Sequence, residues 1–296
     1  MRTCVIFNPV AKGDKARRFR GSLEALGKEC VLKKTAAAGD GRRLAAQAIA
    51  EGFELVVAAG GDGTLNEVLN GFGDAPNGFQ RACLGVLPLG TINVFARELS
   101  IPLTPAAAWA VIRRGREIRV DLPRADFSVN GKRERRFFAQ LAGAGLDARA
   151  IELVSWSLKK KIGSLAYVVA GLKAVAHRRS LITASSGPTS LAGELILIGN
   201  GRRYGGSYQI QPHADLQDGK LDVCVFPRAG WATLLRCGFP LLVRGRLPEH
   251  LVRRFTATDF TLTGASPAAF ELDGDLVGAL PVKFSVEPGA LRVLAP

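Results

Sequence analysis

The chain has 296 residues, of which 47% are hydrophobic, 22% are charged and 34 are glycine. This composition is typical of a globular protein of about two domains and excludes a largely disordered chain. Lys and Arg number 40 against 26 Asp and Glu, and the net charge of +14 favours anionic partners without choosing among them. Five scattered cysteines without a C-x-x-C pair argue against a disulfide framework and a zinc site, and they fit a reducing cytosol.

The longest apolar stretch runs over residues 162–176 and contains Lys173. A membrane-spanning helix needs about 20 apolar residues, so we expect no span. The N-terminus leads directly into a predicted strand, and we expect no secretory leader.

Strands and helices alternate in the first part of the chain. Apolar strands are predicted over 5–7, 30–34, 55–59 and 84–87, with helices over 14–28, 41–51 and 64–71. Alternation at this spacing indicates a parallel sheet with helices on both faces, so we expect a Rossmann-like α/β domain over residues 1–124.

The second part is richer in short strands separated by Gly, Pro and polar turns. The predicted strands are 125–129, 136–141, 195–198, 221–226, 258–263 and 282–286, and helices are predicted over 148–176 and 231–243. We expect a mostly antiparallel β-sandwich over residues 125–284, a cleft between the two domains, and a segment 285–296 that returns to the first domain.

A glycine-rich loop, Gly60-Gly61-Asp62-Gly63-Thr64, joins a buried strand to a helix. Glycines let backbone N–H groups approach an anion, and the start of a helix adds partial positive charge. Asp62 between glycines suits such a phosphate site when a cation is present. The loop is neither a Walker A motif nor a G-x-G-x-x-G fingerprint, and a plain turn is the alternative.

This loop and several later segments resemble the diacylglycerol kinase catalytic domain family. The similar segments are Asn8-Pro9, Leu89-Gly90-Thr91-Ile92-Asn93 through Ile101-Pro102, Gly145-Leu146-Asp147-Ala148, Asn200-Gly201 through Gly205-Gly206, Asp218-Gly219-Lys220-Leu221-Asp222 and Leu272-Asp273-Gly274-Asp275. They follow the family order over almost the whole chain and are most similar to the soluble bacterial lipid kinases. The resemblance implies a phosphofructokinase-like first domain and an ATP- and Mg²⁺-dependent kinase that phosphorylates a hydroxyl of a membrane lipid.

The resemblance also implies which residues contact ATP. They are Asn8, Lys12, Thr35, the loop residues Gly61, Asp62, Gly63, Thr64, Leu65, Asn66 and Glu67, and then Thr91 and Arg97. Ligands usually bind at the carboxyl ends of parallel strands, where most of these residues stand. A local turn bond is the alternative for Thr35 and Thr91.

The family places its general base in the Asp-Gly-Glu turn, so Asp275 is the expected proton acceptor, with Asp273 as its partner and Asp62 facing them. Asp275 replaces the family glutamate and is one methylene shorter. A surface turn without catalysis, in a pseudokinase that binds lipid, is the alternative. Near Asp218, the resemblance implies a structural Mg²⁺ held by that carboxylate and by backbone carbonyls of Asp215 and Lys220; a β-turn without an ion is the alternative.

A lipid kinase must reach a membrane. We expect peripheral attachment of a cytoplasmic protein to an anionic membrane, through an amphipathic basic helix over Trp156–Arg179. Its patch could be extended by Arg236, Arg244, Arg246, Arg253 and Arg254, and a solvated basic face is the alternative. No nucleic-acid partner is expected, because no reading motif is present. An NAD kinase-like activity on a soluble metabolite is the other enzymatic alternative, and the lipid and the oligomeric state stay open.

Overall fold

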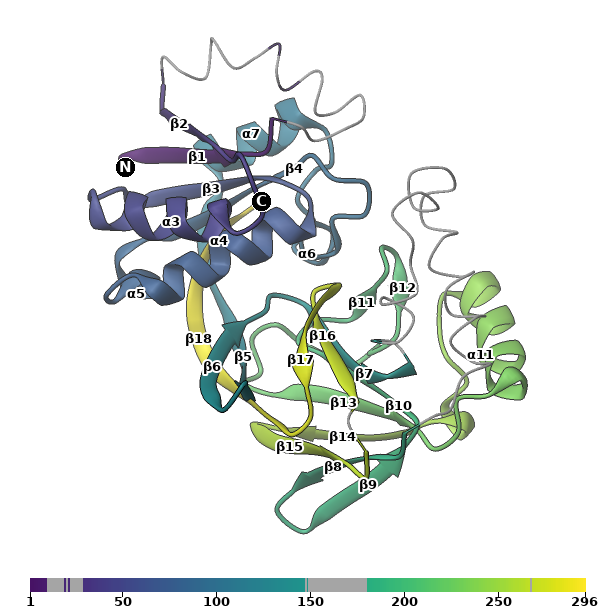
Figure 1. Ribbon diagram of the computed structural model, residues 1–296. Helices are drawn as coiled ribbons and strands as arrows, with labels where there is room; N and C mark the ends of the chain where they lie inside the picture. The colour runs from purple at the N-terminus through teal and green to yellow at the C-terminus, as the bar shows by residue number, and fades with distance from the viewer. Residues whose placement is uncertain (10–18, 20, 22–28, 147, 149–179, 267) are drawn as a thin grey trace.

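The computed structural model describes residues 1–9, 19, 21, 29–146, 148, 180–266 and 268–296. Most of the predicted helices 14–28 and 148–176, the expected basic helix over Trp156–Arg179, and Lys12 and Asp147 lie outside these residues. The described part forms an α/β domain with a mostly parallel sheet and a second, antiparallel β domain (Figure 1), as the sequence predicts.

The first domain is built on four parallel strands. In spatial order these are β2 (Val31–Lys34), β1 (Thr3–Phe7), β3 (Leu55–Gly60) and β4 (Cys83–Pro88). Every residue of β3 and β4 is buried, which explains why these strands read as continuous apolar runs.

Helices cover this sheet. α3 (Asp40–Ala50) and α4 (Asp62–Asp74) pack side by side, and α7 (Pro105–Arg114) packs against β4 (Figure 1). The short helices α5 (Gly78–Arg81) and α6 (Val94–Glu98) follow α4 and β4 in the chain. Gly71 allows the close approach of α3 and α4, because a Cβ there would lie 2.3 Å from the Arg42 carbonyl oxygen.

Two long strands connect the domains. β5 (Arg116–Val129) and β18 (Val282–Ala295) pair antiparallel along most of their length, and β18 also pairs in parallel with β4 at Val293 and Leu84. The predicted strands 125–129 and 282–286 are therefore only one end of each. A register shift between Glu287 and Leu291 absorbs the residues between them as a bulge, so β18 continues well beyond the predicted end at residue 286. The predicted domain boundaries stay predictions.

The β domain consists of two packed sheets. One continues from β18 through β15 (Asp259–Gly264), β8 (Ile182–Ser186) and β9 (Thr189–Gly193), while β6 (Lys132–Phe137) pairs with β5. The other has the order β14 (Arg253–Ala257), β13 (Leu221–Phe226), β10 (Leu195–Gly199), β7 (Leu141–Gly145), β16 (Ala269–Leu272) and β17 (Asp275–Ala279). Phenylalanines fill the space between them: Phe270 contacts Phe127 edge-on, and Phe138 contacts Phe284.

The predicted single strand 136–141 is wrong. β6 ends at Phe137 and β7 begins at Leu141. The backbone N–H groups of residues 139–141 bind the Asp273 carboxylate instead of a neighbouring strand.

A helix and a hairpin lie beside the second sheet. α11 (Trp231–Arg244) packs through Cys237 and Leu241 on β10 and β13. The hairpin of β11 (Arg203–Tyr204) and β12 (Tyr208–Gln209) lies near the C-terminal end of α11, and η1 (Glu249–Leu251) follows that helix. Among the described residues, no helix has the length and apolar character needed to cross a membrane.

Candidate functional site

The start of α4 forms one side of the candidate site. β3 ends at Gly60, and Gly61 caps the helix in an extended conformation; as a glycine, it has no side chain to bond to the N–H groups of the first turn. The first backbone bond of the helix runs from Leu65 N to Gly61 O, at 3.1 Å. The N–H groups of Asp62, Gly63 and Thr64 therefore have no helical partner, which makes this end suitable for an anion.

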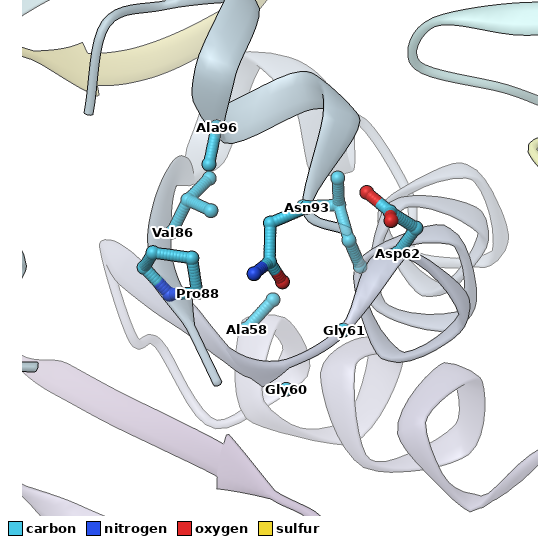
Figure 2. Close-up of a pocket in the computed structure, with 9 residues that line it drawn as sticks. Ala58, Gly60, Gly61, Asp62, Val86, Pro88, Asn93 and Ala96 are labelled. Carbon is cyan, nitrogen blue, oxygen red and sulfur yellow. The ribbon is translucent and has the colours of Figure 1, made fainter. Parts of the chain in front are cut away.

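A second glycine loop touches the first. Leu89 N donates to Gly60 O at 2.8 Å, and a Cβ on Gly90 would lie only 2.5 Å from Gly61 Cα. Only glycine permits this contact, so the loop that leads to the exposed Thr91 is held against the start of α4. Figure 2 shows the Asn93 side chain between these two loops, where its amide bonds to both backbone groups of Gly90.

Asp62 lies at the meeting point of the two loops. Its Oδ1 accepts a hydrogen bond from Val94 N at 2.8 Å. Burial and, to a lesser extent, the negative charge of Asp273 together raise the pKa of Asp62 to about 6, although N–H groups of residues 93–95 oppose the shift. A cation beside Asp62 would relieve both the burial and the repulsion, so the residue suits a Mg²⁺ site.

Asp273, on the turn from β16 to β17, is surrounded by donors. Its Oδ1 accepts from Gln140 N and Leu141 N, at 3.0 and 3.1 Å, and its Oδ2 accepts from Ala139 N and Asn66 Nδ2, at 2.8 and 2.9 Å. Burial raises the pKa of Asp273, and these hydrogen bonds oppose the rise. A carboxylate has about four acceptor positions, and all four are used here. Asp273 is therefore a positioning residue that joins α4 to the β domain, and it is a poor proton acceptor.

Asp275 lies at the exposed start of β17 and faces the glycine loop of the other domain. A Cβ added to Gly63 would lie 3.8 Å from Asp275 Oδ2. The turn that presents it has positive φ angles at Asp273 and Gly274, of 50° and 92°. The structure thus brings Asp275 to the N-terminal end of α4, where a phosphate site is expected, although more than 200 residues separate them in the sequence.

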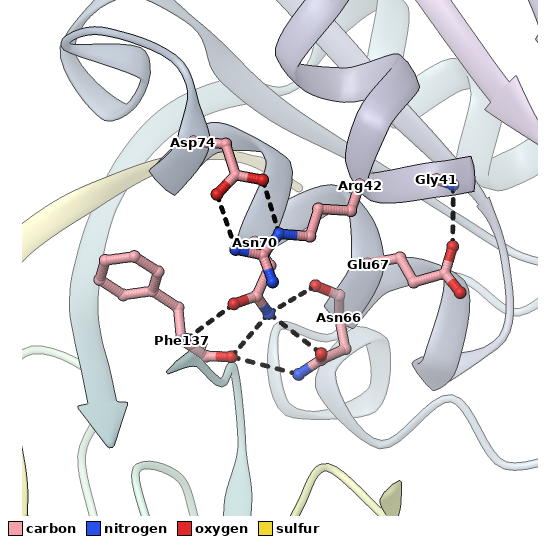
Figure 3. Close-up of polar contacts among 7 residues, drawn as sticks. All are labelled: Gly41, Arg42, Asn66, Glu67, Asn70, Asp74 and Phe137. Atoms are coloured by element: carbon pink, nitrogen blue, oxygen red, sulfur yellow. Dashed lines mark hydrogen bonds and ion pairs between the residues drawn. The ribbon is translucent and has the colours of Figure 1, made fainter. Parts of the chain in front are cut away.

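Glu67 and Asn70 connect α4, which carries the glycine loop at its start, to neighbouring segments (Figure 3). The two carboxylate oxygens of Glu67 accept from Gly39 N and Gly41 N, both at 2.8 Å, and so hold the turn before α3 against α4. Asn70 bonds to both backbone groups of Phe137, at 2.9 Å, and thereby joins α4 to the β domain. The sequence analysis missed Asn70, although it stands one turn after Asn66 on the same face of the helix.

Comparisons with known proteins agree with this geometry. Residues 2–125 match the model of the diacylglycerol kinase catalytic domain, and residues 140–295 match that of the YegS C-terminal NAD kinase beta sandwich-like domain. A protein of Pseudomonas aeruginosa named "Probable lipid kinase YegS-like" is 35% identical over 99% of this chain and 93% of its own length. A "Diacylglycerol kinase" of Staphylococcus saprophyticus is 30% identical over 96% of this chain and 92% of its own.

This chain belongs to the diacylglycerol kinase catalytic domain family and is a lipid kinase. The fold agrees with a crystal structure of a diacylglycerol kinase from Bacillus anthracis, with a TM-score of 0.73 at 19% identity over 100% of this chain and 97% of that one. The family resemblance and fold class expected from the sequence are thus confirmed, and the match over nearly the full length favours a lipid kinase over a kinase of soluble metabolites.

Two further residues expected to contact the nucleotide in this lipid kinase lie at strand ends, and a third lies in a helix. Asn8 follows β1, and the buried Thr35 follows β2, where its N–H donates to Phe7 O at 2.9 Å. Arg97 is in α6, and its Nε donates to the backbone oxygen of Ile92, in the loop before that helix, at 2.8 Å. Their contacts with ATP stay predictions.

Glu98 is a second residue that sequence reasoning missed. Its buried carboxylate accepts from Arg202 Nε and Arg203 N, both at 2.9 Å, and from Gln140 Nε2 at 3.1 Å. Glu98 thus joins α6 of the first domain to the start of the β11–β12 hairpin. The sequence contains no local signal for this contact, because only the fold brings Glu98 next to Arg202 and Arg203.

The predicted structural Mg²⁺ site forms a turn with local bonds. Asp215 Oδ1 accepts from Gln217 N at 3.0 Å, and Asp218 Oδ1 accepts from Lys220 N at 2.9 Å. Within the described part of the chain, no three His, Cys, Asp or Glu residues form a metal-binding group. A site made of one carboxylate and backbone carbonyls stays a prediction.

Proposed function

We propose that the protein transfers the γ-phosphoryl group of ATP, with Mg²⁺, to a hydroxyl of a membrane lipid such as diacylglycerol or a related alcohol. The observation that supports this most directly is the meeting of three features from two domains: the uncapped start of α4, the buried Asp62, and Asp275 opposite Gly63.

The roles follow from the chemistry of each group. Backbone N–H groups of residues 62–64 would hold phosphate oxygens, as helix starts do. Mg²⁺, when bound, would neutralise charge on the transferring phosphoryl group, and Asp62 is the side chain suited to hold it directly or through water. Asp273 cannot serve as a direct ligand while its four acceptor positions are occupied.

Asp275 would accept the proton of the lipid hydroxyl as its oxygen attacks phosphorus. Asp275 is exposed, so a substrate hydroxyl can reach its carboxylate, whereas four N–H donors enclose the carboxylate of Asp273. We therefore keep Asp275 as the proton acceptor, and we assign to Asp273, its expected partner, the role of holding the turn in place.

The test is a kinase assay with γ-labelled ATP and vesicles of a total bacterial lipid extract, with mass identification of the labelled product. We expect a labelled phospholipid that depends on Mg²⁺ and is lost in Asp275→Asn. In one parallel reaction, EDTA replaces Mg²⁺. In another, NAD replaces the lipid vesicles. Label in NADP alone, or lipid labelling that survives in Asp275→Asn at full rate, would refute the proposal.

A further inference from the structure

α11 presents large apolar side chains to solvent. Leu235 is 73% exposed, Val243 65% and Trp231 51%, whereas Cys237 and Leu241 on the opposite side pack into the β domain. Trp231 and Leu235 are one turn apart, and Val243 follows two turns later on roughly the same side. We call these three residues the outer face of α11. Exposed apolar residues gathered on one helix face mark a surface that contacts a partner or a membrane.

The part of the sequence that contains α11 and its flanking segments is strongly basic. From Phe226 to Arg254 the sequence contains six arginines and one acidic residue, Glu249, a formal balance of +5. Arg228, Arg236, Arg246 and Arg253 are exposed. Glu249 is paired with Arg254 at 2.9 Å, so it does not neutralise the exposed arginines. This combination favours an occupant that is apolar inside and negatively charged at its surface.

The outer face is also connected to the candidate site. Gly245, which ends α11, accepts a hydrogen bond from Gln209 N of β12 at 2.8 Å. At the turn of the same hairpin, a Cβ on Gly206 would lie 3.5 Å from Ile92, in the loop before α6. Figure 1 shows α11 on the outside of the β domain, on the same side as this hairpin.

We infer that the outer face of α11 docks on the surface of an anionic lipid bilayer. Trp231, Leu235 and Val243 enter the boundary between headgroups and acyl chains, and the surrounding arginines bind anionic headgroups. We assign a bilayer rather than a protein because the apolar face of α11 is accompanied by exposed arginines on the helix (Arg236) and in the segments before and after it, which suits acyl chains beneath anionic headgroups. This inference deepens the proposed function, because it names the surface by which the enzyme reaches a lipid substrate.

The test is co-sedimentation with vesicles of phosphatidylcholine, alone or mixed with phosphatidylglycerol. We expect binding to the mixed vesicles, which weakens with added salt, and weaker binding to phosphatidylcholine alone. Leu235→Ser should weaken binding about tenfold, because one large apolar side chain no longer enters the bilayer. Trp231→Ser should do the same, and Arg236→Glu should weaken binding to mixed vesicles only.

The matched control is Val129→Ser, which removes an exposed apolar side chain from the tip of the β5–β6 hairpin. This variant should bind vesicles like the unaltered protein. If Leu235→Ser binds as well as this control, the inference is wrong. If the unaltered protein dimerises in analytical ultracentrifugation and Leu235→Ser abolishes the dimer but not vesicle binding, the face contacts a second copy and the inference is also wrong.

Failure here is distinguishable from failure of the proposed function. The lipid that becomes labelled in vesicles is presented again in detergent mixed micelles, which need no docking to a bilayer. Leu235→Ser should phosphorylate it at the normal rate in micelles and more slowly in vesicles. Absence of kinase activity with every lipid refutes the proposed function, while the sedimentation results still decide the docking surface.

Discussion

Three aspartates close to one another have different environments. Asp62 is buried and next to a like charge, Asp273 is surrounded by N–H donors, and Asp275 is exposed. Residue type alone does not separate these roles, because desolvation and hydrogen bonding decide whether a carboxylate stays charged, binds a cation or takes a proton. Substitutions at each position should therefore have different consequences.

Asp62→Asn should abolish most activity and stabilise the metal-free protein. Folding raises the pKa of Asp62 from 3.8 to about 6, so the folded state binds this proton more tightly than the unfolded state does. The ionised group therefore lowers the free energy of unfolding above pH 6, by about 3 kcal/mol, and this cost disappears below about pH 4. Thermal melting without Mg²⁺ should show a higher Tm for the variant at pH 8 and equal values at pH 3.5.

The same titration predicts that Mg²⁺ affinity falls as the pH drops through about 6, because the protonated carboxyl no longer attracts the cation. The activity of the unaltered enzyme at limiting Mg²⁺ should fall over this range and recover with excess Mg²⁺. An activity profile at limiting Mg²⁺ that is flat between pH 5 and 8 would contradict this assignment.

Asp273→Asn and Asp275→Asn should separate structure from catalysis. At position 273 the amide group would face N–H donors, leaving buried donors unpaired and lowering the free energy of unfolding by about 3 kcal/mol. At position 275, which is exposed, stability should change by less than about 0.5 kcal/mol while kcat falls on the order of a thousandfold. Urea unfolding measures the stability of both variants, and steady-state kinetics measures their kcat. If Asp275→Asn loses stability and Asp273→Asn loses only kcat, then Asp273 is the proton acceptor and Asp275 is the positioning residue.

At the scale of elements, the two glycine loops act as one unit. The loop from β3 to α4 and the loop from β4 to α6 contact each other through Gly61 and Gly90. This contact places the exposed N–H groups of α4 beside the loop that presents Thr91. Neither loop alone could form that arrangement.

Gly90→Ala should disturb both loops, because its Cβ would lie 2.5 Å from Gly61 Cα. We expect a loss of about 2 kcal/mol in unfolding free energy and a raised KM for ATP. The control is Gly238→Ala in α11, where no heavy atom lies within 4 Å of the added Cβ and alanine favours the helix by up to about 1 kcal/mol. An unchanged KM in Gly90→Ala would show that the loops bind nucleotide independently.

At the scale of the whole molecule, polar contacts join the two domains in addition to the long strands β5 and β18. Asn66 and Asn70 of α4 reach the segment from Phe137 to Leu141 directly or through Asp273, and Glu98 of α6 reaches residues 202 and 203. These contacts keep Asp275 opposite the glycine loop.

Glu98→Gln should weaken this connection. Loss of the buried charge leaves the guanidinium groups of Arg202 and Arg203, at 2.9 and 3.9 Å from the carboxylate, without their acidic partner, and the free energy of unfolding should fall by about 3 kcal/mol. Arg202→Ala, which removes a half-exposed partner of the same carboxylate, should cost less than about 1 kcal/mol. Denaturant unfolding compares the two, and equal losses would mean that the Glu98 bonds to Gln140 and Arg203 contribute little.

Local sequence patterns were enough to predict many strands and helices of this protein and one part of its candidate site. Buried parallel strands read as apolar runs, so β3 and β4 were predictable, and glycines around Asp62 predicted an anion site at the start of α4. The strand 221–226 and the helix near 231–243 also followed from local patterns. Motif order alone identified the family.

Only the tertiary structure decided the rest. The full length of β5 and β18, the irregular segment 138–140 and the pairing of Glu98 depend on partners far away in the chain. The same is true of the division between Asp273 and Asp275, because the donors that saturate Asp273 come from residues 66 and 139–141. Local patterns record backbone preference and burial, whereas the charge state of a side chain depends on which distant groups the fold places beside it.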